Sequence, residues 1–383
     1  MILYLLIFIT SVAFFFLTLS NNQKKQVRIA TWYLIGLGIF IGLADMLGGY
    51  DRYIYAEIFD GMADVTSTGG NPWKSASFLF YSSEFGYSTL CALISYITSN
   101  RYIFIFIVTI IIYLLLIISL KRYVENMPFA IILFLGLWVF FTFTYLRQVL
   151  GCTIIWLSVE YIYKRNFKRF LLVWFIGFSF HNSAIIFFPM YFIPIKKVSA
   201  INVVIIMIVA LAIGLSSVPH NLFEMYGEMD SERMGVAGYS EESEFRIAYL
   251  IESLFFLFLI LTNYRRIPNN PKEVTLLNIA LVFCAILLVF VRSENGGRLG
   301  WFFLIGVFYT ISTICINKKG LTIYGAMLIV VSLFLYLRIF TAWQNYMNLY
   351  PYKTFLTDGH REGDPVWERY EYDLNYDRNK FYR

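Results

Sequence analysis

The stretch that decides the fold is "PFAIILFLGLWVFFTFTYLRQVLGCTIIWLSVEYIY", residues 128–163, in which Arg147 stands between two long apolar runs. Each run is close to the length of about 17–25 residues that crosses a hydrocarbon core about 30 Å thick. An arginine stays charged, and placing it at the centre of a membrane helix costs about 2.5–3.5 kcal/mol on insertion scales. We therefore expect two membrane helices, 128–145 and 146–163, joined by an outer turn that carries Arg147.

The whole chain has this apolar character. Of its 383 residues, 59% are hydrophobic, 20% are aromatic and only 15% are charged, whereas soluble domains contain about 25% charged residues. The composition predicts an all-α polytopic integral membrane protein, with a single transmembrane domain over residues 1–338. The four cysteines are scattered without metal-ligand spacing, so we expect small core residues and no metal site.

The connections between the apolar blocks are of two kinds. One kind is basic, and positive charge beside membrane helices stays cytoplasmic. The other kind is acidic or rich in tyrosine and tryptophan, and comprises the external loops 49–99 and 217–244 and the C-terminal tail 339–383. The basic connections, which we place inside, carry Lys24, Lys25, Arg28, Lys121, Arg122, Lys164, Arg165, Lys168, Arg169, Lys196, Lys197, Arg265, Arg266, Lys272, Lys318 and Lys319.

About twelve transmembrane helices give the even number of crossings that these basic connections require. Residues 169–195 are too few for two full spans, so we expect a broken or re-entrant helix that turns near His181, in a place buried by protein or lining a watery cavity. The stretch 86–99 is also short and is expected to lie along the outer face of the membrane. The expected helices are 1–20, 29–48, 100–120, 128–145, 146–163, 169–181, 182–195, 199–216, 245–263, 273–291, 299–316 and 321–338.

With this topology, the polar residues at the helix ends gather on the outer side. They predict one outward-facing polar site just below the outer surface. Its candidate members are Tyr50 and Asp51 after the second helix, Glu84, Arg147 with Gln148, His181, and Arg292, Glu294 and Arg298 in "VRSENGGRLGW".

Some of these residues also have structural interpretations. An arginine at a helix end such as Arg338 can extend toward lipid phosphate, and a histidine such as His181 can be a hydrogen-bonded packing residue. The aromatic side chains of the tail can stack on sugars or belong to a membrane-interface belt. The sequence leaves these alternatives open.

Anions that live at a bilayer surface are chiefly lipid phosphates and diphosphates, and the planar guanidinium fork suits them. Arg147 and Arg298 would stabilise a leaving diphosphate as its negative charge grows. A carboxylate or histidine nearby would accept the proton of an attacking sugar hydroxyl. The basic residues sit in short loops between apolar blocks, so we expect no nucleic-acid partner. We also expect no cofactor.

Six short sequence motifs, in this order along the chain, indicate a family resemblance. They are "GYDRYIYAEIF" (49–59), "SEFGYSTLCALIS" (83–95), "RQVLGCTIIWLS" (147–158), "FHNSAIIFFPMYF" (180–192), "GGRLGWFF" (296–303) and "YPY" (350–352). With these motifs the chain resembles the EpsG-type members of the Wzy polysaccharide polymerases.

The resemblance implies a GT-C-like glycosyltransferase of the bacterial inner membrane, with its active site facing the periplasm or cell exterior. It implies transfer of a growing glycan from undecaprenyl diphosphate onto the non-reducing end of another lipid-linked repeat unit, with inversion. Because no cluster of acidic residues has metal-ligand spacing, we expect cationic side chains to take the place of a divalent metal. Arg147 and Arg298 would grip the diphosphate, and His181, Glu84 or Asp51 would orient or deprotonate the acceptor. Membrane lipid, a flippase and a chain-length regulator are the implied partners.

Two alternatives remain at this stage. A lipid-linked glycan ligase uses the same donor with a different acceptor and would share the outer arginines and histidine. A polysaccharide flippase or transporter would instead place charges at mid-membrane and show repeat symmetry between its halves.

Overall fold

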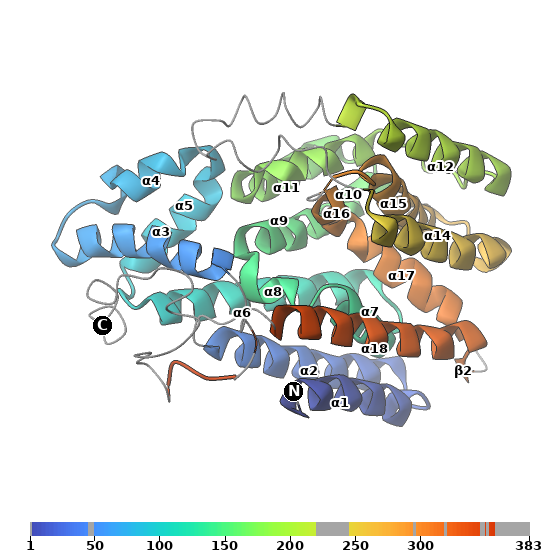
Figure 1. The fold of residues 1–383 in the computed structure, drawn as a ribbon, viewed down its shortest axis with the longest axis horizontal. Helices are drawn as coiled ribbons and strands as arrows, with labels where there is room; N and C mark the ends of the chain where they lie inside the picture. Colours follow the sequence, from blue (N-terminus) through green and yellow to red (C-terminus); the bar gives the residue numbers. More distant parts are fainter. Residues whose placement is uncertain are drawn as a thin grey trace. The chain divides into compact units, whose positions relative to one another are not determined.

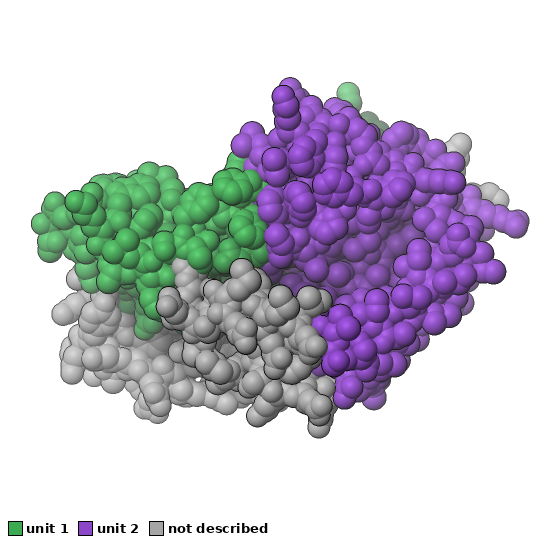
Figure 2. All heavy atoms as spheres, turned by 90° about the horizontal axis from the view of Figure 1, so that it is seen from above, with its two compact units in different colours: residues 1–154, 175–182, 326–383 green, residues 155–174, 183–325 purple. Residues whose placement is uncertain are grey.

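The computed structural model describes residues 2–44, 50–219, 245–293, 296–317, 320–344, 349 and 352–356. The chain divides into two compact units, which Figure 2 colours separately. Unit 1 comprises residues 1–154, 175–182 and 326–383, and unit 2 comprises 155–174 and 183–325. Most of the predicted loop 217–244 and the end of the tail lie outside the described residues.

Within the described residues the protein is helical apart from one small hairpin, β1 (Ile316–Asn317) and β2 (Gly320–Leu321). Five helical segments are long and apolar enough to cross a membrane: Gln23–Leu43, Arg101–Tyr123, Pro271–Val289, Gly296–Cys315 and Ile323–Trp343. The chain is therefore an all-α, multi-pass membrane protein. Twelve spans and a GT-C fold stay predictions.

Unit 1 begins with two apolar helices and ends with the C-terminal helix (Figure 1). Its helical elements are α1 (Ile2–Thr18), α2 (Gln23–Leu43), α3 (Tyr50–Ser67), η1 (Pro72–Lys74), α4 (Ala76–Phe80), η2 (Ser82–Glu84), α5 (Phe85–Ser95), α6 (Arg101–Tyr123), α7 (Met127–Leu137), α8 (Phe141–Thr144), most of α9 (Leu146–Leu157), the end of α11 (Phe167–Phe180) and most of α18 (Ile323–Gln344).

Helices α2 and α6 pack against each other and define two ends of unit 1. At one end, the Gln23 side chain donates a hydrogen bond to the Glu125 carbonyl at 3.4 Å, which brings the first two basic connections together. At the other end, Arg52 of α3 donates to the carbonyls of Ile41 and Ala44 at the end of α2. Helix α6 has 23 residues, so these ends lie about 34 Å apart along it at 1.5 Å per residue.

Residues 50–95, predicted as a connection, fold into a helical layer that we call the α3–α5 cap. Helix α3 packs against α4, α5 and α6, as Figure 1 shows for the blue and cyan helices. The rings of Phe59 and Phe104 stack at 4.3 Å, and Asp60 pairs with Arg101 at the start of α6. Tyr55, Phe59 and other buried residues of α3 recur at helical spacing, which places one face of α3 in the core.

The described part of the tail packs on the same end of unit 1. Helix α18 continues to Gln344, six residues beyond the predicted end of the span, because the residues after Arg338 are still mostly apolar. Tyr352 then stacks on Phe40 of α2 at 4.1 Å, and the N–H of Phe355 bonds to the carbonyl of Leu43 at 3.2 Å. These aromatic residues of the tail therefore complete the core at the end of α2.

The two helices predicted at 128–145 and 146–163 are interrupted, which corrects the sequence prediction. Helix α7 ends at Leu137, where the N–H of Val139 reaches back five residues to the carbonyl of Phe134 and widens the turn. The second prediction divides into α9 and α10 (Val159–Tyr163) at Ser158. Local apolar composition did not reveal either interruption.

Unit 2 is built around α15 (Pro271–Val289), which packs against α10, α12, α14, α16 and α17. Arg165 donates to the Tyr191 and Ile193 carbonyls, and Lys197 donates to those of Tyr264 and Ile267. Three basic connections therefore meet at one end of unit 2, as placement on one side of a membrane requires. The other elements of the unit are η3 (Asn182–Tyr191, from its second residue), α12 (Ala200–Leu215), α14 (Ile247–Thr262), η5 (Tyr264–Arg266), α16 (Gly296–Gly300), η6 (Trp301–Phe303) and α17 (Leu304–Cys315).

Candidate functional site around Glu84

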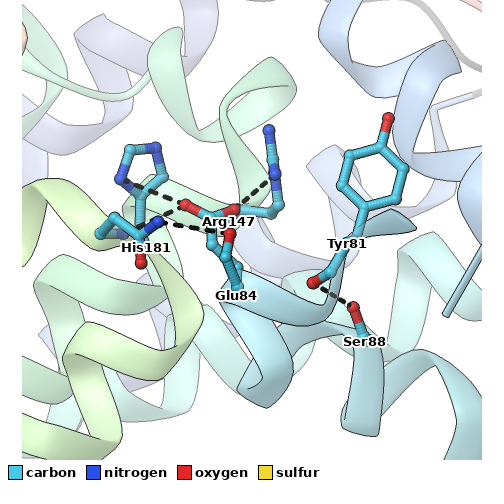
Figure 3. Close-up of polar contacts among 7 residues, drawn as sticks. Tyr81, Glu84, Ser88, Arg147 and His181 are labelled. Carbon is cyan, nitrogen blue, oxygen red and sulfur yellow. Dashed lines mark hydrogen bonds and ion pairs between the residues drawn. The ribbon is translucent and has the colours of Figure 1, made fainter. Parts of the chain in front are cut away.

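The carboxylate of Glu84 is the centre of a polar cluster within unit 1. Its Oε2 pairs with Nη1 of Arg147, and its Oε1 accepts a hydrogen bond from the backbone N–H of Asn182 at 3.1 Å. The same Oε1 lies 3.9 Å from Nδ1 of His181. Figure 3 shows the imidazole and the guanidinium both directed at this carboxylate. Three residues predicted from separate motifs are thus brought together.

Arg147 is the second residue of α9, at the positive end of the helix dipole. The first backbone N–H groups of a helix have no partner within it, so this end favours an anion and disfavours a cation. The Glu84 carboxylate offsets the unfavourable placement of the guanidinium. Together, the helix end and the guanidinium form a place where negative charge is stabilised.

His181 lies where α11 ends and the 3₁₀ helix η3 begins. Its N–H still bonds to the carbonyl of Gly177 at 3.3 Å, but the next N–H, that of Asn182, bonds to Glu84 instead of continuing the helix. The predicted break at residue 181 is therefore present. Its re-entry into the membrane stays a prediction.

Two glycines let the end of α11 approach the other elements of the site. A Cβ at Gly86 of α5 would lie 2.3 Å from Oγ of Ser179 and 3.0 Å from its backbone carbonyl. A Cβ at Gly151 of α9 would lie 3.3 Å from the Gly177 carbonyl and 3.4 Å from Cβ of His181. Close contact with α5 on one side and α9 on the other fixes His181 next to Glu84 and Arg147.

Two tyrosine rings of the α3–α5 cap surround the guanidinium of Arg147. Its Cζ lies 5.2 Å from the ring centre of Tyr55 and 5.6 Å from that of Tyr81, both within the range of a cation–π interaction. Sequence reasoning missed both rings, because it treated residues 49–86 as a connection. The signal that could have found Tyr55 is the helical spacing of buried residues in "GYDRYIYAEIF".

The comparisons with known proteins identify the family of this chain. The EpsG family matches residues 29–354, most of the chain and every residue of the Glu84 cluster. The chain belongs to the EpsG family. Comparison with curated proteins and comparison with solved structures each gave no match. Membership of the EpsG family indicates a role in polysaccharide polymerisation and agrees with a multi-pass membrane protein.

In this EpsG-family protein, two of the three side chains at the centre of the site are partly exposed. The side chains of Arg147 and His181 are 19% and 20% exposed, while Glu84 is 8% exposed. Behind them, burial raises the pKa of the Tyr87 phenol well above its usual value, so this phenol stays neutral. Arg147 and His181 are therefore the more exposed members of the cluster, while Tyr87 is a buried, neutral phenol. Among the described residues, no group of three or more His, Cys, Asp or Glu side chains is placed to hold a metal ion.

The other predicted site residues of unit 1 lie close in sequence to this cluster. Gln148 follows Arg147 in α9 and is only 2% exposed. Asp51 is half-buried in the first turn of α3, the helix that carries Tyr55. Tyr50 begins α3, and its side chain lies outside the described part of the structure. Roles for these three residues stay predictions.

The remaining predicted residues belong to unit 2. Arg298 is half-buried in α16, with Cζ 5.8 Å from the ring centre of Trp301, and Arg292 is exposed. Glu294 lies outside the described residues. Participation of these residues in the same site as Arg147 stays a prediction from the sequence.

Proposed function

We propose that this EpsG-family protein polymerises undecaprenyl diphosphate-linked oligosaccharide repeat units at the outer face of the bacterial inner membrane. It would transfer the growing glycan from its lipid diphosphate onto the non-reducing end of a new lipid-linked repeat. The observation that supports this most is the pairing of Arg147, at the positive end of α9, with a carboxylate beside a histidine. This combination offers one group for an anionic leaving group and two groups for a proton.

Arg147 would bind the diphosphate of the donor. Negative charge grows on the diphosphate as the glycosidic bond to it breaks, and a positioned cation stabilises that charge. The first N–H groups of α9 add to the same field. The proposal keeps Arg298 and Arg292 as further diphosphate ligands, with Gln148, Glu294 and Tyr50 in contact with the substrate.

His181 would accept the proton of the acceptor hydroxyl, with Glu84 holding the imidazole. The acceptor oxygen forms its bond to the anomeric carbon as the bond from that carbon to the diphosphate oxygen breaks. Because one displacement occurs, the configuration of the anomeric carbon inverts. Glu84 itself and Asp51 are the other candidate bases.

The two ends of unit 1 support an outward-facing site. The α3–α5 cap adjoins the end of α2 and the start of α6, whereas the basic connections adjoin the opposite ends of these helices. Positive charge stays cytoplasmic, so the cap and the Glu84 cluster would face outward. A flippase would supply the lipid-linked repeats there, and a chain-length regulator would act beside the enzyme.

The experiment is elongation of a synthetic undecaprenyl diphosphate oligosaccharide by purified protein in lipid nanodiscs, read as a gel ladder. We expect a ladder from the wild type with a chelator present, and products of inverted anomeric configuration by NMR. The variant Arg147→Ala should lower the rate about 10²–10³-fold, the usual effect of removing a group that stabilises developing negative charge. The variant Arg28→Ala, which removes an exposed arginine from a basic connection, is the matched control.

A normal ladder from folded Arg147→Ala would refute the assignment of this residue. Transfer of preformed chains to a different acceptor, without any ladder, would indicate the ligase instead.

A further inference from the structure

The Glu84–Arg147 pair places an anion of the protein on the group that is proposed to bind an anionic substrate. Two tyrosine rings lie within cation–π distance of the guanidinium. The N–H groups of a guanidinium lie in its plane, so its hydrogen bonds to any anion are made along the edge of that plane. Glu84 takes the Nη1 group of that edge. A diphosphate that uses the whole edge of Arg147 must therefore compete with Glu84.

The carboxylate has a second anchor that does not depend on Arg147. Its Oε1 bonds to the N–H of Asn182 at 3.1 Å, and Nδ1 of His181 is 3.9 Å from the same oxygen. When Oε2 leaves the guanidinium, Glu84 stays held at the end of α11. A small rotation then brings it into hydrogen-bond distance of the imidazole.

We propose that Glu84 is an exchangeable ligand of Arg147, and that the diphosphate of the donor displaces it toward His181. This inference rests on the proposed function and adds to it an order of events. A diphosphate carries more negative charge than one carboxylate and bonds to the guanidinium fork with two oxygens, which favours the exchange.

The exchange couples donor binding to the orientation of the base. A carboxylate that accepts a hydrogen bond from Nδ1–H leaves Nε2 of the imidazole as the proton acceptor. Donor binding thus adds the Glu84 carboxylate to the groups that orient His181. Without the donor, the carboxylate of Glu84 neutralises the charge of Arg147, so that no uncompensated cation lies at the N-terminal end of α9. Glu84 is in this sense a positioning residue.

The test is the sign of the change in diphosphate affinity when Glu84 is altered. Purified protein in phosphatidylcholine nanodiscs is titrated with inorganic diphosphate by calorimetry, and elongation is measured in parallel. Removal of the competing charge in Glu84→Gln should lower the Kd about fivefold, the factor that a modest ion pair contributes. Elongation by Glu84→Gln should fall about tenfold, because His181 loses the negative charge of the Glu84 carboxylate.

Two further variants complete the design. Glu84→Asp keeps the charge but shortens the side chain by one methylene, which should weaken its contact with Arg147, so it should also bind diphosphate more tightly. Glu160→Gln removes a carboxylate from the exposed pair with Lys164 and should bind as the wild type does. If Glu84→Gln does not fold, Glu84→Asp decides the question.

The outcomes separate this inference from the proposed function. Weaker or unchanged diphosphate binding by the Glu84 variants, with loss of binding by Arg147→Ala, would overturn the exchange and leave Arg147 as the diphosphate ligand. Diphosphate binding that Arg147→Ala leaves intact would overturn both.

Discussion

The buried ion pair between Asp60 and Arg101 allows a quantitative test of how the α3–α5 cap is held. Both side chains are 1% exposed, and Nε of Arg101 donates to Oδ2 of Asp60 at 2.7 Å, with Nη2 donating to the same oxygen. The change Asp60→Asn keeps the shape of the side chain and removes its charge. Because the buried guanidinium then loses the negative charge of Asp60, the free energy of unfolding should fall by about 3–5 kcal/mol.

The loss of stability should be greatest in the α3–α5 cap, because the ion pair joins α3 to the start of α6. We expect faster hydrogen exchange across residues 50–95, and slower elongation because Tyr55 and Glu84 belong to the same cap. The measurements are denaturant unfolding in mild detergent and hydrogen exchange by mass spectrometry. The double variant Asp60→Leu/Arg101→Met should recover most of the stability, since an apolar pair buries no charge.

Glu160→Gln is the control for this prediction, because its partner Lys164 is 58% exposed and its loss should leave unfolding unchanged. Unfolding of Asp60→Asn at the wild-type midpoint would refute the reasoning. A double variant no more stable than Asp60→Asn would refute it equally, because the cost would not come from the unpaired charge.

Two further predictions concern packing and sidedness. Gly86→Ala should destabilise the protein by about 1–3 kcal/mol and slow elongation, because its Cβ would lie 2.3 Å from Oγ of Ser179. Gly36→Ala is the control, because nothing lies within 4 Å of the added Cβ there. Equal thermal midpoints for the two variants would contradict the close packing of α5 on α11. All four native cysteines are buried, so an introduced cysteine can be labelled selectively. A cysteine at exposed Ser83 should react with an impermeant maleimide added outside the cell, whereas one at exposed Lys24 should react only after the membrane is permeabilised. The reverse pattern would place the Glu84 cluster in the cytoplasm.

Several elements could be predicted from the sequence because their causes are local. The expected helices 100–120 and 273–291 correspond closely to α6 and α15. In each, an asparagine cap precedes an apolar block, Asn100 for α6 and Asn270 for α15. The family resemblance was confirmed by the match to the EpsG family over residues 29–354. It could be predicted because its motifs are visible in order along the chain. The predicted break at His181 followed from the short length of residues 169–195 together with the even number of crossings that the basic connections require.

The α3–α5 cap and the interruption after α7 could not be predicted in this way. Residues 50–67 carry too many polar groups to be recognised as membrane helix, and α3 becomes stable by packing against α4, α5 and α6. Helix α7 ends within an uninterrupted apolar run, where Trp138 is fully buried. In both places tertiary packing overrides the local pattern.

The sequence by itself determined that this chain forms apolar helices with charged side chains at their ends, because hydrophobic length and capping act over a few residues. It also indicated Glu84, Arg147 and His181 as candidate members of one outer polar site, but not which of them contact one another. Only the tertiary structure decided that one carboxylate lies beside both others, since these contacts join residues 63 and 97 positions apart. The close packing at Gly86 and Gly151 that permits those contacts is a property of the assembled helices.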